Sequence, residues 1–149
     1  MLTEYKGEIF NIQKHGKKAD IWRYDPVKGF RKTDIGIDGI FCYEKTVKLK
    51  DTNGYFSVIF RAFSNGREFY VDDVRGNDVV VIIMDEVYAK EHGFHPIERP
   101  LWIDQISNES FDEFQMTIHN EENGEETVTK FDWPQMQINW ARYHDGVDY

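Results

Sequence analysis

Hydrophobic and polar positions alternate along much of the chain, and this alternation predicts a mainly β fold. The stretch "FQMTIHN" places Phe114, Met116 and Ile118 on one face of a strand and polar residues on the other. The stretch "TVTKFDW" alternates in the same way, and the two flank Asn123-Gly124. Because Asn-Gly favours tight hairpin turns, we expect a β-hairpin with the acidic loop "NEENGEE" at its tip.

Similar patterns predict further strands. A first hairpin is expected from "EIFNIQ" and "DIWRY", joined by the turn "KHGKKA". Three strands are then expected as a meander from Phe41 to Val74, in which Asn53-Gly54 joins "FCYEKTVKLK" to "YFSVIFRAF" and "SNG" leads into "REFYVDDV".

Near the end of the chain, "MQINWARY" predicts one more strand. In this strand Met136, Ile138 and Trp140 would face the same side.

The stretch "VVVIIMDEVYAKEHGFH" combines a β-branched run with better helix formers and predicts a buried strand followed by a short helix over Asp85–His92. Gly93 lies where a glycine commonly follows a helix. The histidines and acids of this stretch raise the question of a metal site. His92 and His95 lack the spacing of four on one helix that zinc peptidases use, so we interpret His92 as a helix-end residue.

Taken together, the patterns predict a single globular domain over residues 1–149. Its fold class is mainly β (α+β): an antiparallel meander, sandwich or partly open barrel of roughly eight strands with one short helix. A chain with 15% aromatic residues has enough apolar surface to fold.

Composition narrows the functional classes. The start of the chain lacks a secretory pattern, and the longest apolar run, "VVVIIM", is far shorter than the roughly 20 residues of a membrane helix, so we expect a cytoplasmic protein. The single cysteine, Cys42, excludes an internal disulfide and a multi-cysteine zinc site.

Nucleotide-binding and nucleophile-elbow motifs are absent from the sequence. We therefore expect no enzymatic activity, no cofactor and no metal. Cys42 is expected to be an apolar filler in its strand. Acid–base chemistry by His119 or His144 stays open, because partners distant in sequence can converge in a fold.

Charge is distributed unevenly. The net charge is −9, and residues 98–149, with 12 acids and three bases, supply all of it. Residues 1–32 instead hold eight bases and four acids. Such a distribution favours a basic protein partner over nucleic acid or a membrane, although an acidic face retained for solubility would give the same composition.

Tyr and Trp, which are enriched at binding hot spots, occur among these acids. The candidate partner-binding residues are Glu121, Glu122, Glu125, Glu126, Asp132, Trp133, Trp140, Tyr143 and Asp145.

The acidic segments "NEENGEE" and "FDWPQMQINWARYHDGVDY" give the chain a resemblance to bacterial immunity proteins, the antitoxin-like inhibitors of toxin domains. This resemblance implies a cytoplasmic, non-enzymatic inhibitor that covers the active site of a cognate toxin or basic enzyme. A monomer or weak homodimer is expected.

Two other functional classes remain open. One is a small β-rich ligand-binding or hydrolytic domain in which Phe41, Tyr43, Phe56 and Phe60 line a pocket. The other is a structural or phage-type component that self-associates through an exposed strand edge.

Overall fold

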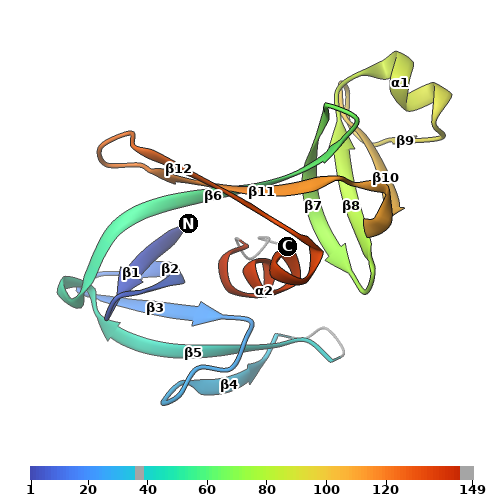
Figure 1. The fold of residues 1–149 in the computed structure, drawn as a ribbon. Helices are drawn as coiled ribbons and strands as arrows, with labels where there is room; N and C mark the ends of the chain where they lie inside the picture. Colours follow the sequence, from blue (N-terminus) through green and yellow to red (C-terminus); the bar gives the residue numbers. More distant parts are fainter. Residues whose placement is uncertain (36–38, 145–149) are drawn as a thin grey trace. The chain divides into compact units, whose positions relative to one another are not determined.

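A computed structural model describes residues 1–35 and 39–144. The described residues form a mainly β fold, as predicted, with the strands in one open antiparallel sheet and with two α-helices where one was expected (Figure 1). The strands number twelve in this part of the chain, more than the roughly eight expected, because several of them are short. The strands are β1 (Leu2–Tyr5), β2 (Glu8–His15), β3 (Lys18–Arg23), β4 (Arg31–Asp34), β5 (Phe41–Lys48), β6 (Thr52–Ser64), β7 (Arg67–Arg75), β8 (Asp78–Ile83), β9 (His95–Pro96), β10 (Trp102–Ser107), β11 (Glu113–Asn120) and β12 (Glu126–Phe131). The helices are α1 (Glu86–Glu91), α2 (Trp133–Tyr143) and the short 3-10 helices η1 (Leu49–Asp51) and η2 (Asn108–Ser110).

The chain divides into two compact units. The first unit comprises Met1–Val58, Ile118–Thr127 and Ile138–Tyr149. The second comprises Ile59–Thr117 and Val128–Gln137. Strands β6, β11 and β12 and helix α2 therefore contribute residues to both units. The single domain over residues 1–149 stays a prediction, and each unit is described by itself below.

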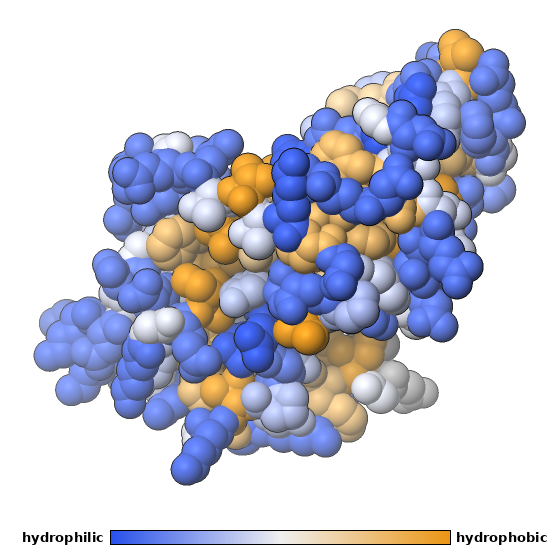
Figure 2. Space-filling view, viewed as in Figure 1, coloured by the Kyte–Doolittle hydropathy of each residue, from blue (hydrophilic) through white to orange (hydrophobic). Residues whose placement is uncertain are grey.

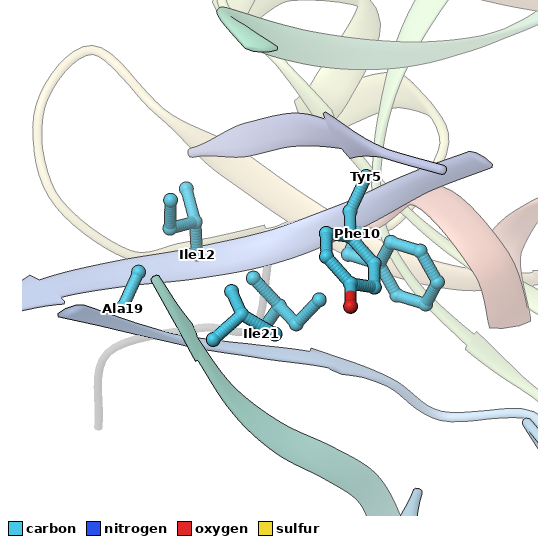
Figure 3. Close-up of a cluster of buried hydrophobic side chains, with 6 residues drawn as sticks. Tyr5, Phe10, Ile12, Ala19 and Ile21 are labelled. Carbon is cyan, nitrogen blue, oxygen red and sulfur yellow. The ribbon is translucent and has the colours of Figure 1, made fainter. Parts of the chain in front are cut away.

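The core of the first unit forms on one face of its sheet. Antiparallel pairing places Ile12 opposite Ile21 and Ala19 opposite Val47, so their side chains share a face. Figure 3 shows the side chains of this cluster. The buried members are Tyr5, Phe10, Ile12, Ala19, Ile21 and Val47.

The first predicted hairpin is confirmed. Strands β2 and β3 pair from Asn11 opposite Trp22 to His15 opposite Lys18. Gly16 in the turn has a φ of +66°, a conformation that glycine adopts without strain.

The predicted hairpin between β5 and β6 is wrong. β5 pairs with β3 and β4, whereas the start of β6 pairs with β1, where Asn53 lies opposite Glu4. Asn53-Gly54 lies within β6, at a register shift, and the hydroxyl of Thr3 donates to the carbonyl oxygens of both residues. The dipeptide thus forms an irregularity in a paired strand, another role that glycine commonly has.

The later part of the meander is confirmed in the second unit. β6 and β7 form a hairpin around Asn65-Gly66, with φ values of +49° and +78° at the two turn positions. Both positive φ values fit a two-residue hairpin turn. The second unit packs around the buried ring of Phe69, whose centroid lies 5.5 Å from that of Phe111 and 6.4 Å from that of Phe94.

Helix α1 confirms the predicted short helix. The Asp85 side chain accepts a hydrogen bond from the backbone N–H of Tyr88, as an N-cap residue does. His92 is the C-cap residue, and Gly93 follows it with a φ of +75°.

The strand predicted over "MQINWARY" is wrong, because this segment belongs to helix α2. Asp132 accepts a hydrogen bond from the N–H of Gln135 and so caps the helix. Pro134 lies in the first turn, where its missing N–H costs no helical hydrogen bond. Met136 is buried and Ile138 is exposed, so the two do not share a face as predicted.

Candidate functional site

The predicted hairpin of β11 and β12 is confirmed, and it carries the four glutamates of the acidic loop (Figure 1). We call Glu121, Glu122, Glu125 and Glu126 the acidic tip. All four residues are exposed. In Figure 2 hydrophilic residues cover the end of this hairpin.

Two asparagines fix the backbone of the tip. The side-chain oxygen of Asn120 accepts hydrogen bonds from the N–H groups of Glu122, at 2.9 Å, and Asn123, at 3.3 Å. The side-chain oxygen of Asn123 accepts from the N–H of Glu125 at 2.9 Å. Asn side chains commonly bond to nearby backbone in this way in turns. The loop geometry is therefore set by the chain itself, without a ligand.

The side chains of the acidic tip differ in their surroundings. Glu121 accepts a hydrogen bond from the hydroxyl of Ser57 at 2.6 Å. One ring nitrogen of His119 lies 3.2 Å from a carboxylate oxygen of Glu126, and the other lies 4.0 Å from one of Glu121. In residues 1–35 and 39–144 no Lys or Arg forms an ion pair with any carboxylate of the tip.

Two arginines of the basic opening segment, residues 1–32, pair with acids outside the tip. The guanidinium of Arg23 bonds to both oxygens of Asp25, and Arg31 pairs with Glu44. Of the described Asp and Glu residues after position 97, Glu113 alone forms an ion pair with a Lys or Arg. Its partner is Lys130, at 3.8 Å. No described Lys or Arg of residues 1–32 therefore forms an ion pair with the tip.

The aromatic residues of helix α2 in the first unit are half-buried rather than fully exposed. The ring of Trp140 stacks on His144 with centroids 4.6 Å apart, and Tyr24 stacks on His144 at 4.4 Å. Tyr143 is also half-buried. Ile138 is the large apolar side chain of this part of α2 that is exposed, with an exposed fraction of 46%.

The remaining candidate partner-binding residues belong neither to the acidic tip nor to the first-unit part of α2. Asp132 and Trp133 belong to the second unit, where Asp132 caps α2 and the Trp133 ring lies 5.5 Å from that of Phe114. Asp145 lies outside the described residues.

The histidine-rich stretch forms a helix end, as interpreted from the sequence. The His92 ring stacks on Tyr88 with centroids 3.8 Å apart, and its Nδ1 lies 2.9 Å from the Tyr88 carbonyl oxygen. Within the described residues, no group of three or more His, Cys, Asp or Glu side chains could hold a metal ion. Cys42 is buried, and desolvation raises the pKa of its thiol.

The aromatic residues proposed to line a pocket have unlike surroundings. Phe60 is buried in the second unit, whereas Phe41 is exposed in the first unit and has the Lys32 ammonium 4.3 Å from its ring centroid. A cavity of about 300 Å³ in the second unit is instead lined by other aromatic rings. Its lining comprises Ser64, Phe69, Tyr88, His92, Phe94, Asp104, Ile106, Ser110 and Phe111.

Sequence reasoning missed a larger cavity in the first unit. It has a volume of about 650 Å³ and is lined by Lys17, Lys18, Lys48, Leu49 and Lys50. The segments "KHGKK" and "KLK" were the available signal, but they are far apart in the sequence.

None of the helices in the described ranges is long and apolar enough to cross a membrane. Comparison with models of protein families, with curated proteins and with solved structures finds no match to this chain.

Proposed function

We propose that this chain is a small, non-enzymatic inhibitor that binds a basic protein through the acidic tip. Following the resemblance to immunity proteins, its partner is a toxin domain or other enzyme whose active site carries positive charge. The inhibitor acts by covering that site.

The observation that carries the proposal is the set of four exposed carboxylates on a hairpin loop with a defined backbone and without Lys or Arg partners in the described residues. Like charges within a Debye length of about 8 Å repel one another at physiological salt. A cationic partner relieves this repulsion, whereas phosphate backbones and anionic lipid surfaces increase it.

The fixed loop matters for affinity. Binding normally costs free energy because loops and side chains must be ordered in the complex. In the tip, Asn120 and Asn123 already hold the loop, so the backbone contribution to this cost is reduced. Complementary charge then accelerates association.

Trp140 and Tyr143 remain proposed anchors on the first unit. Trp140 is half-buried and stacks on His144, which restricts the orientation of its ring. Rigid aromatic side chains lose little conformational entropy when a partner covers them. These anchors are expected to affect the dissociation rate more than the association rate.

The test compares two variants with equal changes in charge. The tip variant carries Glu121→Gln, Glu122→Gln, Glu125→Gln and Glu126→Gln. The control carries Asp72→Asn, Glu91→Gln, Glu98→Gln and Glu109→Gln, all at exposed positions of the second unit. Both are measured against the partner that the tagged wild-type chain captures from its native host.

We expect the tip variant to associate at least about tenfold more slowly at low salt, with a flatter dependence on salt, and the control to change less. The captured partner should lose its activity when one equivalent of the wild-type chain is added. Equal association rates for the two variants, or a partner that is nucleic acid or an acidic protein, would contradict the proposal.

A further inference from the structure

Four lysines of the first unit surround the cavity that the sequence did not reveal. We call Lys17, Lys18, Lys48 and Lys50, with Leu49 between the last two, the lysine cavity. It lies where β3 begins and β5 ends (Figure 1). Hydrophilic residues predominate on the surface at this end of the strands (Figure 2).

Backbone pairing brings the lysines together from segments about 30 residues apart. Lys18 lies directly opposite Lys48 in the antiparallel pair of β3 and β5. The N–H of Leu49 donates to the carbonyl oxygen of Lys17 at 2.9 Å, which fixes η1 against the β2–β3 turn. Lys50 is the second residue of η1. The sheet register therefore fixes the backbone positions of Lys18 and Lys48, and the η1 contact fixes those of Lys17 and Leu49.

The charge of the cavity is not compensated by nearby acids. All four lysines are exposed, and within the described residues none forms an ion pair with an acid. Asp20 lies two residues after Lys18 on the same face of β3, but its oxygens contact the His15 ring at 3.0 Å and the Thr46 hydroxyl at 2.6 Å. Asp51 follows Lys50 directly and is exposed.

Such an arrangement has an energetic cost without a ligand. Like charges directly opposite on neighbouring strands destabilise a sheet. The Lys18–Lys48 pair is of this kind, and Lys17 and Lys50 add to the repulsion. An anion bound in the cavity would attract the four ammonium groups and so offset their mutual repulsion.

The shape and chemistry of the cavity indicate the class of anion. Its volume of about 650 Å³ lies within the range of small-molecule sites. Lysine stems and Leu49 offer an apolar wall beneath the ammonium groups. Ammonium groups bind phosphates as point charges. One phosphate monoester carries about two negative charges at neutral pH, so a chain of two or three phosphates matches four lysines better.

We infer that the lysine cavity binds a small organic di- or triphosphate. A long nucleic acid fits less well, because its charged backbone would continue past the cavity over a chain with a net charge of −9. The site is independent of the acidic tip, so each can fail without the other.

The test uses the full chain and adenosine triphosphate without Mg²⁺ as the probe, with binding measured by calorimetry at 50 and 150 mM salt. The site variant is Lys18→Gln with Lys48→Gln. The matched control, Lys6→Gln with Lys28→Gln, removes the same charge from exposed positions of the first unit outside the cavity. Inorganic tripolyphosphate, sulfate and a single-stranded oligonucleotide serve as comparison ligands.

We expect saturable binding of one adenosine triphosphate, weakened at least about tenfold in the site variant and less than about twofold in the control. Tripolyphosphate should bind more weakly than the nucleotide, because it cannot use the apolar wall, and sulfate more weakly still. Without ligand, the site variant should melt no lower than the wild type, because a like-charge pair has been removed. No saturable binding, equal weakening in both variants, or affinity that grows with oligonucleotide length would overturn the inference.

Discussion

Asp25 pairs with a buried arginine, Arg23, in the first unit, so substitution of Asp25 should lower the free energy of unfolding substantially. Its two carboxylate oxygens accept from Nε and a terminal nitrogen of Arg23 at 2.9 and 2.8 Å. The Arg23 side chain is only 7% exposed, and that of Asp25 is 21% exposed. Arg142 of α2 approaches the same carboxylate at 3.5 Å but is 46% exposed.

These contacts set the expected magnitude. Removing one partner of a buried ion pair costs about 3–5 kcal/mol. Asp25 is partly exposed, and Glu8 lies 3.5 Å from the Arg23 guanidinium as a second partner, so Asp25→Asn should cost about 3 kcal/mol, at the lower end of this range. For a chain of this length, that corresponds to a fall of about 6–12 °C in the melting temperature.

Urea denaturation with double-mutant cycles measures the two contacts separately. The coupling free energy of Asp25→Asn with Arg23→Met should be about 2 kcal/mol, and with Arg142→Gln less than about 1 kcal/mol, because exposed pairs contribute little. Asp51→Asn, at an exposed position, is the control and should change stability by less than about 0.5 kcal/mol. A loss below about 1 kcal/mol for Asp25→Asn, or a larger coupling with Arg142, would refute this reasoning.

Three further predictions concern other parts of the fold. Ile21→Ala, at a side chain with 0% exposure, should lower the free energy of unfolding by about 2–5 kcal/mol in urea titrations, whereas Ile138→Ala should change it by less than about 0.5 kcal/mol. The Tyr88 N–H lowers the pKa of Asp85, so the stability that Asp85 adds relative to Asp85→Asn should be present at neutral pH and disappear as pH falls through that lowered pKa in denaturation series. Burial raises the pKa of Cys42, so mass spectrometry should find its alkylation at pH 8 slower than that of a cysteine in an unstructured peptide.

Local patterns predicted hairpins where alternation and turn chemistry agreed with the tertiary pairing. Both conditions hold at Asn65-Gly66. Asn53-Gly54 carries the same local signal, but β1 pairs with this segment and leaves β5 to pair with β3 and β4. Which strand pairs with β5 or with the start of β6 depends on hydrogen bonds between strands that are distant in the sequence. The dipeptide Asn53-Gly54 carries no information about them.

The end of the chain fits two periodicities. Met136, Ile138 and Trp140 alternate as in a strand, but Met136, Trp140 and Tyr143 also follow the i, i+4, i+7 spacing of a helix. The capping residue Asp132 and the early Pro134 were the deciding signals.

The two candidate sites differ in how far the sequence could reveal them. The acidic tip is contiguous, so its residues and its hairpin could both be predicted from a few neighbouring positions. The lysine cavity depends on Lys18 lying opposite Lys48, and that register follows from the pairing of β3 with β5. A shift of one residue would place the two ammonium groups on opposite faces of the sheet.

The interleaving of the two compact units limits how the chain can be dissected. Each unit is assembled from discontinuous pieces, with its boundaries inside β6, β11, β12 and α2. Ending the chain at residue 117 would remove the final piece of the second unit and the last two pieces of the first. Neither unit can be excised as one uninterrupted polypeptide, so tests of either proposed binding site must rely on point substitutions in the intact molecule.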